Sequence, residues 1–175
     1  MRTRDRLLIA IVLLVAVGLV VLRGMPPGGQ DIATAAVFEA AFPDSEGQMQ
    51  ALSQWRNKTV VLNFWASWCP PCRDEMPELS ALQDKYRGSG LVVVGLSTDD
   101  ADKLREFSAS NSVSYPLLAG DFEAMRLATT LGNDREVLPY TVVIRPDGKI
   151  AASHFGRLDM VALEQVLPPL PMAPR

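Results

Sequence analysis

The two cysteines of the chain, Cys69 and Cys72, lie three positions apart in the segment Trp-Cys-Pro-Pro-Cys, directly after an apolar run. Two residues between the sulfurs keep them within disulfide reach across one helical turn, so the pair can open and close without refolding. A pair with this spacing can be a redox-active dithiol, part of a metal site, or a small structural staple.

A metal site at this pair would need two more ligands. The chain has no other cysteine and a single histidine, His154, which is more than 80 positions away. We expect His154 to occupy a surface or half-buried position in a late strand rather than to bind a metal. A disulfide that closes so small a loop constrains the unfolded chain little. The favoured interpretation is therefore a redox-active dithiol that needs no metal and no cofactor.

The elements on either side of the pair explain how the sulfurs could react. Thr59 to Trp65 is β-branched and apolar, which predicts a buried strand, and a helix is expected to begin at Pro70. Proline suits the first helical turn because it has no amide hydrogen to leave unpaired there. Unpaired amides and the helix dipole at that end favour a thiolate on Cys69. We expect Cys69 to attack a substrate disulfide and the deeper Cys72 to resolve the mixed disulfide.

The remaining elements indicate an α/β fold. A strand at 91–97 follows the helix expected at 70–87 and completes a βαβ unit with a right-handed crossover. The other expected elements are a hairpin at 42–48, a helix at 102–110, a short strand at 115–118, a helix capped by Asp121 with Phe122, Met125, Ala128 and Leu131 on one face, a hairpin of 140–145 and 149–154, and a helix from 159. Parallel and antiparallel strands then share one mixed central sheet, with helices on both faces.

The N-terminal segment predicts a single transmembrane anchor. Leu7 to Leu22 has no charged residue and is preceded by Arg2, Arg4 and Arg6. An uncleaved anchor is favoured over a signal peptide because no small-x-small site closes the run. The arginines place the start in the cytoplasm. Everything after Arg23 is then expected on the outer side of the inner membrane, in the periplasm or outside the cell. The expected division is an anchor at 1–25, a linker at 26–37, one domain at 38–167 and a Pro-rich tail at 168–175.

Charge and cysteine content exclude two classes of protein. Four of the 17 Lys and Arg residues and one of the 20 Asp and Glu residues lie in 1–25, which leaves residues 26–175 with a formal charge near −6. No Lys/Arg run or aromatic–basic interleaving is present, so we expect no nucleic-acid partner. A domain of this size buries a sufficient core by itself, so two cysteines do not indicate a disulfide-stapled scaffold.

The segment N-F-W-A-S-W-C-P-P-C resembles the thioredoxin fold, and other segments narrow the resemblance. Leu138-Pro139 before the late hairpin is similar to the cis-proline loop of that fold, which packs against the dithiol. Residues 115–131 resemble the helix–strand insertion, and 42–58 the N-terminal hairpin, of the TlpA/ResA/CcmG branch. The resemblance covers about 38–167 and implies a membrane-anchored thiol-disulfide oxidoreductase of the bacterial periplasm or outer cell surface.

The resemblance also implies roles for individual residues. Glu75 lies one helical turn after Cys72, matches an acid of the ResA-like branch, and is assigned as the proton acceptor for Cys72. The alternative is a solvated acid in the first turns of a helix. Asn63 stands where thioredoxin has a buried carboxylate, and the main chain of Leu138 is expected to pair with a substrate peptide. The expected substrate-binding residues are Trp68, Pro70, Pro71, Leu138 and Pro139.

Together these features predict an anchored reductase of protein disulfides. By resemblance, its substrates would be proteins such as apocytochrome c, through its haem-attachment cysteines, or an oxidase assembly factor, through its copper-site cysteines. A membrane electron donor would re-reduce the dithiol. Three alternatives stay open: a disulfide oxidant or exchanger, a Cu(I) chaperone that uses both cysteines with Met76, and a non-redox tethered adaptor. A reduction potential well below the poise of the compartment would indicate a reductase rather than an oxidant.

Overall fold

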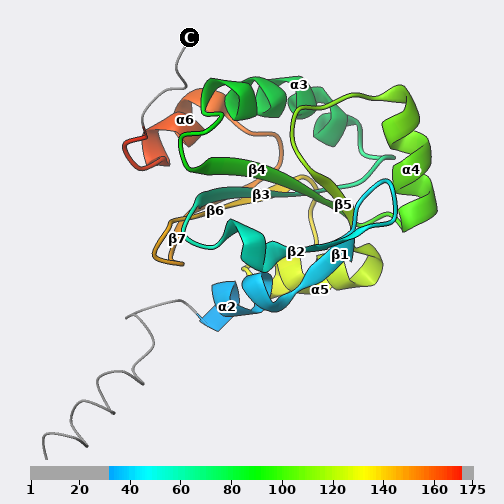
Figure 1. Cartoon of the computed structure of the whole chain (residues 1–175), viewed down its shortest axis with the longest axis horizontal. Coiled ribbons are helices and arrows are strands. Elements are labelled where there is room, and N and C mark those ends of the chain that lie inside the picture. The colour runs from blue at the N-terminus through cyan, green and yellow to red at the C-terminus, as the bar shows by residue number, and fades with distance from the viewer. Residues whose placement is uncertain (1–31, 171–175) are drawn as a thin grey trace, which may run out of the picture.

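The computed structural model describes residues 32–170. They form a five-stranded sheet, a two-stranded sheet and the helices around them (Figure 1). The elements in chain order are α2 (Ile32–Glu39), β1 (Ala41–Pro43), β2 (Met49–Ala51), a 3₁₀ turn (Leu52–Trp55), β3 (Thr59–Trp65), α3 (Pro70–Lys85), β4 (Leu91–Ser97), α4 (Ala101–Ser110), β5 (Leu117–Ala119), α5 (Asp121–Thr130), β6 (Tyr140–Ile144), β7 (Ile150–Phe155) and α6 (Met160–Val166).

The larger sheet has the order β5-β4-β3-β6-β7. β3, β4 and β5 run parallel, whereas β6 is antiparallel to β3 and β7 is antiparallel to β6. Helices α3 and α6 lie over one face of this sheet, and α2 and α5 lie over the other (Figure 1). The predicted mixed sheet with helices on both faces is confirmed, as is the N-terminal hairpin.

Burial on both faces explains why β3 and β4 consist of apolar residues almost without alternation. Every residue of both strands is buried. Successive side chains of β3 enter opposite layers: Val61 and Trp65 belong to the core beneath α3, and Leu62 and Phe64 belong to the core shared with α2 and α5. Packing on both faces therefore fixes the C-terminal end of β3, and the turn that carries the dithiol follows directly.

The expected linker at 26–37 was wrong in its second half. Residues from Ile32 onward form helix α2, and its Val37 and Phe38 are buried in the core. The buried Thr34 hydroxyl donates a hydrogen bond to the carbonyl oxygen of Gly148, in the turn between β6 and β7. The helix has no acidic residue in its first turn and no basic residue in its last, and packing against distant segments holds it in place. The domain thus begins at or before residue 32.

Helix α5 begins differently from the expectation. Asp121 is not its cap: the N-cap position belongs to Gly120, and Asp121 lies within the helix with φ of 46°. The close approach of the chain explains the glycine, because a Cβ at Gly120 would lie 2.6 Å from the Cβ of Ala124. Phe122 is 84% exposed, so it is not on the buried face. That face is made by Ala124, Leu127, Ala128 and Leu131.

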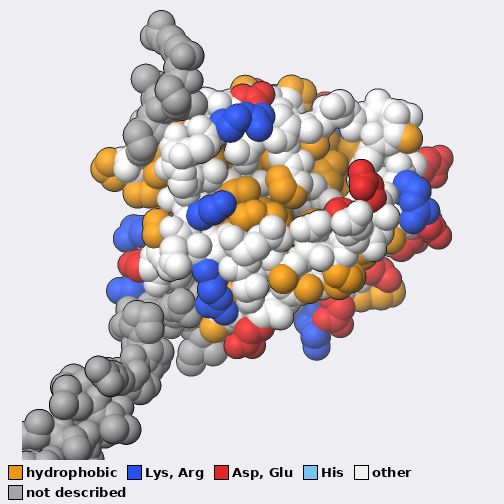
Figure 2. Space-filling view, viewed as in Figure 1, with side chains coloured by type: hydrophobic (Ala, Val, Ile, Leu, Met, Phe, Trp, Pro, Cys, Tyr) orange, Lys and Arg blue, Asp and Glu red, His pale blue; other side chains and the backbone are white. Residues whose placement is uncertain are grey.

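Among residues 32–170, no helix is both long enough and apolar enough to cross a bilayer. The expected anchor and residues 171–175 of the expected tail lie outside the described residues. On the molecular face shown in Figure 2, Lys and Arg side chains are scattered and interspersed with Asp and Glu, so they do not form a continuous basic surface there.

Candidate active site

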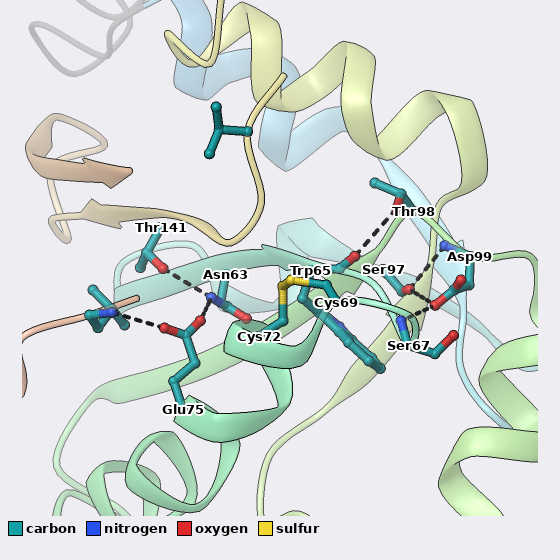
Figure 3. The surroundings of a disulfide bond; sticks show 12 residues. Asn63, Trp65, Ser67, Cys69, Cys72, Glu75, Ser97, Thr98, Asp99 and Thr141 are labelled. Atoms are coloured by element: carbon teal, nitrogen blue, oxygen red, sulfur yellow. Dashed lines mark hydrogen bonds between the residues drawn. A yellow bond between two sulfur atoms is a disulfide. The ribbon is translucent and has the colours of Figure 1, made fainter. Parts of the chain in front are cut away.

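Cys69 and Cys72 form a disulfide at the first turn of α3, and their Cα atoms are 5.3 Å apart (Figure 3). Cys69 is the N-cap residue, and Pro70 and Pro71 occupy the first two helical positions. Because proline has no amide hydrogen, the first N–H of the helix belongs to Cys72. Cys69 is 4% exposed and Cys72 is fully buried. An attacking group can therefore reach Cys69 first, and Cys72 lies behind it.

A buried carboxylate holds the turn that carries Cys69. Asp99, just after β4, accepts hydrogen bonds from the amide of Ser67 at 2.7 Å and from the hydroxyl of Ser97 at 2.8 Å. The amide of Thr98 donates to the carbonyl oxygen of Trp65 at 2.9 Å. These contacts lie on one side of the disulfide in Figure 3. They connect the C-terminal ends of β3 and β4 and fix the chain immediately before the dithiol.

A second polar group lies under α3 on the other side of the disulfide (Figure 3). Glu75 is fully buried. Its Oε1 accepts from Nδ2 of Asn63 at 2.7 Å, and its Oε2 accepts from the amide of Leu158 at 3.0 Å. Asn63 Nδ2 also donates to the hydroxyl of Thr141 at 3.0 Å. The solvated-acid alternative is therefore wrong, because this carboxyl is removed from water.

The environment of Glu75 changes its acidity in two opposing ways. Burial raises the pKa of the Glu75 carboxyl above its ordinary value of 4.5. The hydrogen bonds from Leu158 and Asn63, and the positive charges of His154 and Arg157, act in the opposite direction but do not cancel the effect of burial. A carboxyl with a raised pKa, one turn along the helix from Cys72, is better matched to exchange a proton with a thiol than an ordinary solvated glutamate is.

The loop before β6 lies at the sheet edge where β3 ends. Tyr140 pairs with Phe64, and the Leu138-Pro139 peptide bond just before it is cis, as the resemblance implies. Leu138 packs against the core that contains both cysteines. Buried Asn133 shapes this loop through two hydrogen bonds with the main chain of Val137, at 2.9 and 3.1 Å.

The two tryptophans near the dithiol differ in burial. Trp65 is fully buried and its ring lies 4.8 Å from that of Phe107, whereas Trp68 is 70% exposed. Trp68 thus presents an aromatic surface next to Cys69. Met76 is buried within the core. His154 lies exposed in β7, which agrees with the surface position expected for it. Within residues 32–170, no group of three or more His, Cys, Asp or Glu side chains is placed to hold a metal ion.

Residues 33–153 match the AhpC/TSA family. The chain is also 30% identical over 125 residues to the thiol-disulfide oxidoreductase ResA of Bacillus thuringiensis strain Al Hakam, an alignment that covers 71% of this chain and 70% of ResA. The chain belongs to the AhpC/TSA family. Within that family it is a thiol-disulfide oxidoreductase of the ResA type, and its two cysteines form the Cys69–Cys72 disulfide described above.

Two further comparisons extend the similarity. ResA of Bacillus subtilis is 26% identical over 160 residues, which cover 86% of this chain and 83% of that protein. The crystal structure of a Chlorobium tepidum protein assigned as the thiol:disulfide interchange protein DsbE superimposes with a TM-score of 0.63 at 29% identity. It covers 73% of this chain and 89% of that chain. These similarities confirm the thioredoxin-like fold.

The sequence did not identify every residue that builds the site. Asp99 and Thr141 were missed, and Asn63 was noted without its partner Glu75. One signal for Asp99 was available, because an acid that follows a buried parallel strand lies at the same sheet edge as the end of β3. The amide of Leu158 could not be identified from the sequence, because every residue except proline has a backbone N–H.

The raised pKa of Glu75 predicts how pH affects the stability of the oxidised protein. A group whose pKa is higher in the folded state contributes stability that is complete below about pH 4.5 and is lost as the pH rises through the folded-state pKa. Glu75→Gln has no such proton, so its free energy of unfolding relative to wild type should rise with pH, by about 1.4 kcal/mol for each unit of the pKa shift. Urea unfolding between pH 4.5 and 8 measures this difference.

The control is Glu78→Gln, which removes a partly exposed carboxyl one turn further along the helix. Its stability relative to wild type should change little over the same pH range. A constant difference between Glu75→Gln and wild type at every pH would contradict the raised pKa.

Proposed function

We propose that this protein is a reductase of protein disulfides, held by its N-terminal segment at the outer face of the cytoplasmic membrane. One observation carries the proposal: a dithiol at the start of α3 has a reachable Cys69, a buried Cys72, and a buried acid one turn further along. The uncharged run after three arginines supports the membrane location. The ResA relatives support the type of reaction.

The reaction transfers two electrons. The Cys69 thiolate attacks one sulfur of the substrate disulfide, forms a mixed disulfide and displaces the first substrate thiolate. Cys72 then attacks the sulfur of Cys69, which releases the second substrate thiolate and closes the Cys69–Cys72 disulfide seen here. Glu75 accepts the proton that Cys72 loses. The substrate disulfide is reduced to two thiols, and a dithiol donor in the membrane must return two electrons to the enzyme.

The surface around Cys69 is suited to an extended polypeptide. Trp68 provides an exposed apolar contact, and the main chain of Leu138 can pair with a substrate segment because the Pro139 nitrogen donates no hydrogen bond. Main-chain pairing of this kind selects for shape more than for sequence. The proposed clients are disulfides formed by haem-attachment or copper-site cysteines of proteins that mature outside the cytoplasm.

Trapping with Cys72→Ser tests this function. In the full chain, reduced Cys72→Ser should attack a client through Cys69 and then stop, because no second thiol resolves the mixed disulfide. The adduct should accumulate in cells, separate on a non-reducing gel, disappear with dithiothreitol, and reveal the client by mass spectrometry. The matched control, Cys69→Ser, should form far less adduct because Cys72 is fully buried. Absence of any adduct with Cys72→Ser would refute the proposed function.

A further inference from the structure

A single peptide group connects two titratable side chains that lie on different elements. His154 Nε2 lies 2.9 Å from the carbonyl oxygen of Arg157, and the amide of the next residue, Leu158, donates to Glu75 Oε2 at 3.0 Å. That carbonyl and that amide belong to the same peptide group, so the two hydrogen bonds act in series. Because a carbonyl oxygen only accepts, Nε2 must carry the hydrogen.

The other carboxyl oxygen of Glu75, Oε1, contacts a row of sheet residues that also contains His154. Asn63 pairs with Thr141, and Thr141 pairs with His154, so the three residues form a row across β3, β6 and β7. Asn63 donates both to Glu75 and to Thr141, and the Glu75 carboxylate points toward this row in Figure 3. The imidazole at the end of the row is exposed to solvent, whereas Glu75 is fully buried. The row therefore joins the buried acid to the protein surface.

We propose that His154 is a positioning residue that sets the protonation state of Glu75 through the Arg157–Leu158 peptide group. This inference deepens the proposed function and rests on it in one respect: the protonation state of Glu75 matters for catalysis only if Glu75 takes the proton of Cys72. His154 would then adjust the release of reduced substrate to the pH outside the membrane.

The direction of the coupling follows from elementary electrostatics. An imidazolium is a stronger hydrogen-bond donor than a neutral imidazole, and it polarises the peptide group that accepts its bond. The polarised amide of Leu158 donates more strongly to Glu75, and a hydrogen bond to a carboxylate favours the ionised form. The positive charge of His154 also lowers the pKa of Glu75 directly. Protonation of His154 therefore helps Glu75 to ionise.

The other groups around Glu75 do not change charge in the same range. Asn63 and Thr141 are neutral, Cys72 is in the disulfide, and Arg157 stays charged and pairs with Glu78 at 3.4 Å. Burial, with a contribution from Glu75, raises the pKa of Tyr115, which therefore stays neutral. Solvated carboxyl groups ordinarily titrate below pH 5, whereas an imidazole ordinarily titrates between pH 5 and 8. Among the described groups facing the acid, His154 is the one suited to report external pH.

The single histidine of the chain makes the coupling directly measurable. In the oxidised full chain, the titration midpoint of the His154 C2–H resonance is measured by NMR in wild type and in Glu75→Gln. Loss of the carboxylate should lower this midpoint, because coupling between two sites is reciprocal. In His154→Gln, which keeps a donor but never gains a charge, the Glu75 carboxyl should titrate at higher pH by the same amount. Unchanged midpoints in both experiments overturn the proposal.

Two further measurements separate this inference from the proposed function. The rate at which Cys72 resolves a preformed mixed disulfide should show a pH profile displaced to higher pH in His154→Gln, with the same plateau. Lys149→Gln, which removes a positive charge near the other end of β7, should leave the profile in place. A profile that does not move in His154→Gln overturns the role of His154 in catalysis. If Cys72→Ser traps no client, the proposed function fails. The NMR titrations still test, independently of any client, whether His154 and Glu75 are coupled.

Discussion

Cys69→Ser is expected to lose disulfide-reductase turnover by about a thousandfold or more, because the covalent first step needs a thiolate that serine cannot supply. The structure gives the reason for the asymmetry between the cysteines. Cys69 is the N-cap of α3, where the helix dipole favours a negative charge, and it is the cysteine that solvent reaches. The turnover rate is measured by incubating the enzyme with a model protein disulfide, stopping the reaction at intervals and assaying the free thiols formed.

Cys72→Ser is the matched control for this prediction. It should retain the first step at close to the wild-type rate in a single-turnover assay while losing multiple turnover, because only the release step needs Cys72. Alkylation by iodoacetamide at neutral pH gives an independent measure: in the reduced protein, Cys69 should react much faster than Cys72. Equal and slow alkylation of both thiols would contradict the thiolate assigned to Cys69.

Asn63→Asp is expected to destabilise the folded domain by about 2–5 kcal/mol at pH 8. It replaces the amide that donates to Glu75 Oε1 at 2.7 Å by a second carboxyl group in a fully buried site. Two carboxylates at this distance cannot both ionise, so the folded state raises the pKa of one of them. The stability of the variant should therefore fall as the pH rises, and it should approach that of wild type in acid. Chemical denaturation of the oxidised protein at several pH values measures this effect.

The double variant Asn63→Asp/Glu75→Gln tests the cause of that destabilisation. It exchanges the positions of the acid and the amide and leaves one carboxyl in the site, so most of the lost stability should return. A double variant that is less stable than Asn63→Asp alone would show that the loss comes from packing rather than from paired charges. A single variant as stable as wild type at pH 8 would contradict the contact between Asn63 and Glu75.

Elements that depend on local sequence were predicted well. The bounds of β3 and β4 agree with the expected strands because a strand covered on both faces must be apolar throughout, and Pro70 marks the start of α3. Trp65 is the last residue of β3 and is buried, whereas Trp68 lies in the turn that follows and is exposed. Such features need only a short window of sequence.

Features that depend on distant contacts could not be predicted in the same way. Glu75 meets Asn63 across 12 positions and Leu158 across 83, and Asp99 meets Ser67 across 32. Helix α2 has no acidic residue in its first turn and no basic residue in its last, and its Thr34 reaches Gly148 across 114 positions. No local pattern encodes these pairings, because they arise only when the sheet order is known. The resemblance to the ResA branch supplied a role for Glu75 but not its neighbours.

If the proposed anchor spans the membrane, the packing of α2 limits the distance between the dithiol and the lipid. With residues 32–37 folded onto the domain, the tether between the proposed anchor and the globular body has at most the six residues 26–31 instead of the expected 12. Six extended residues span at most about 20 Å, half the reach of the longer tether. We expect such a short tether to keep Cys69 close to the bilayer. Clients attached to or emerging from that membrane would then meet Cys69 far more often than freely diffusing proteins do.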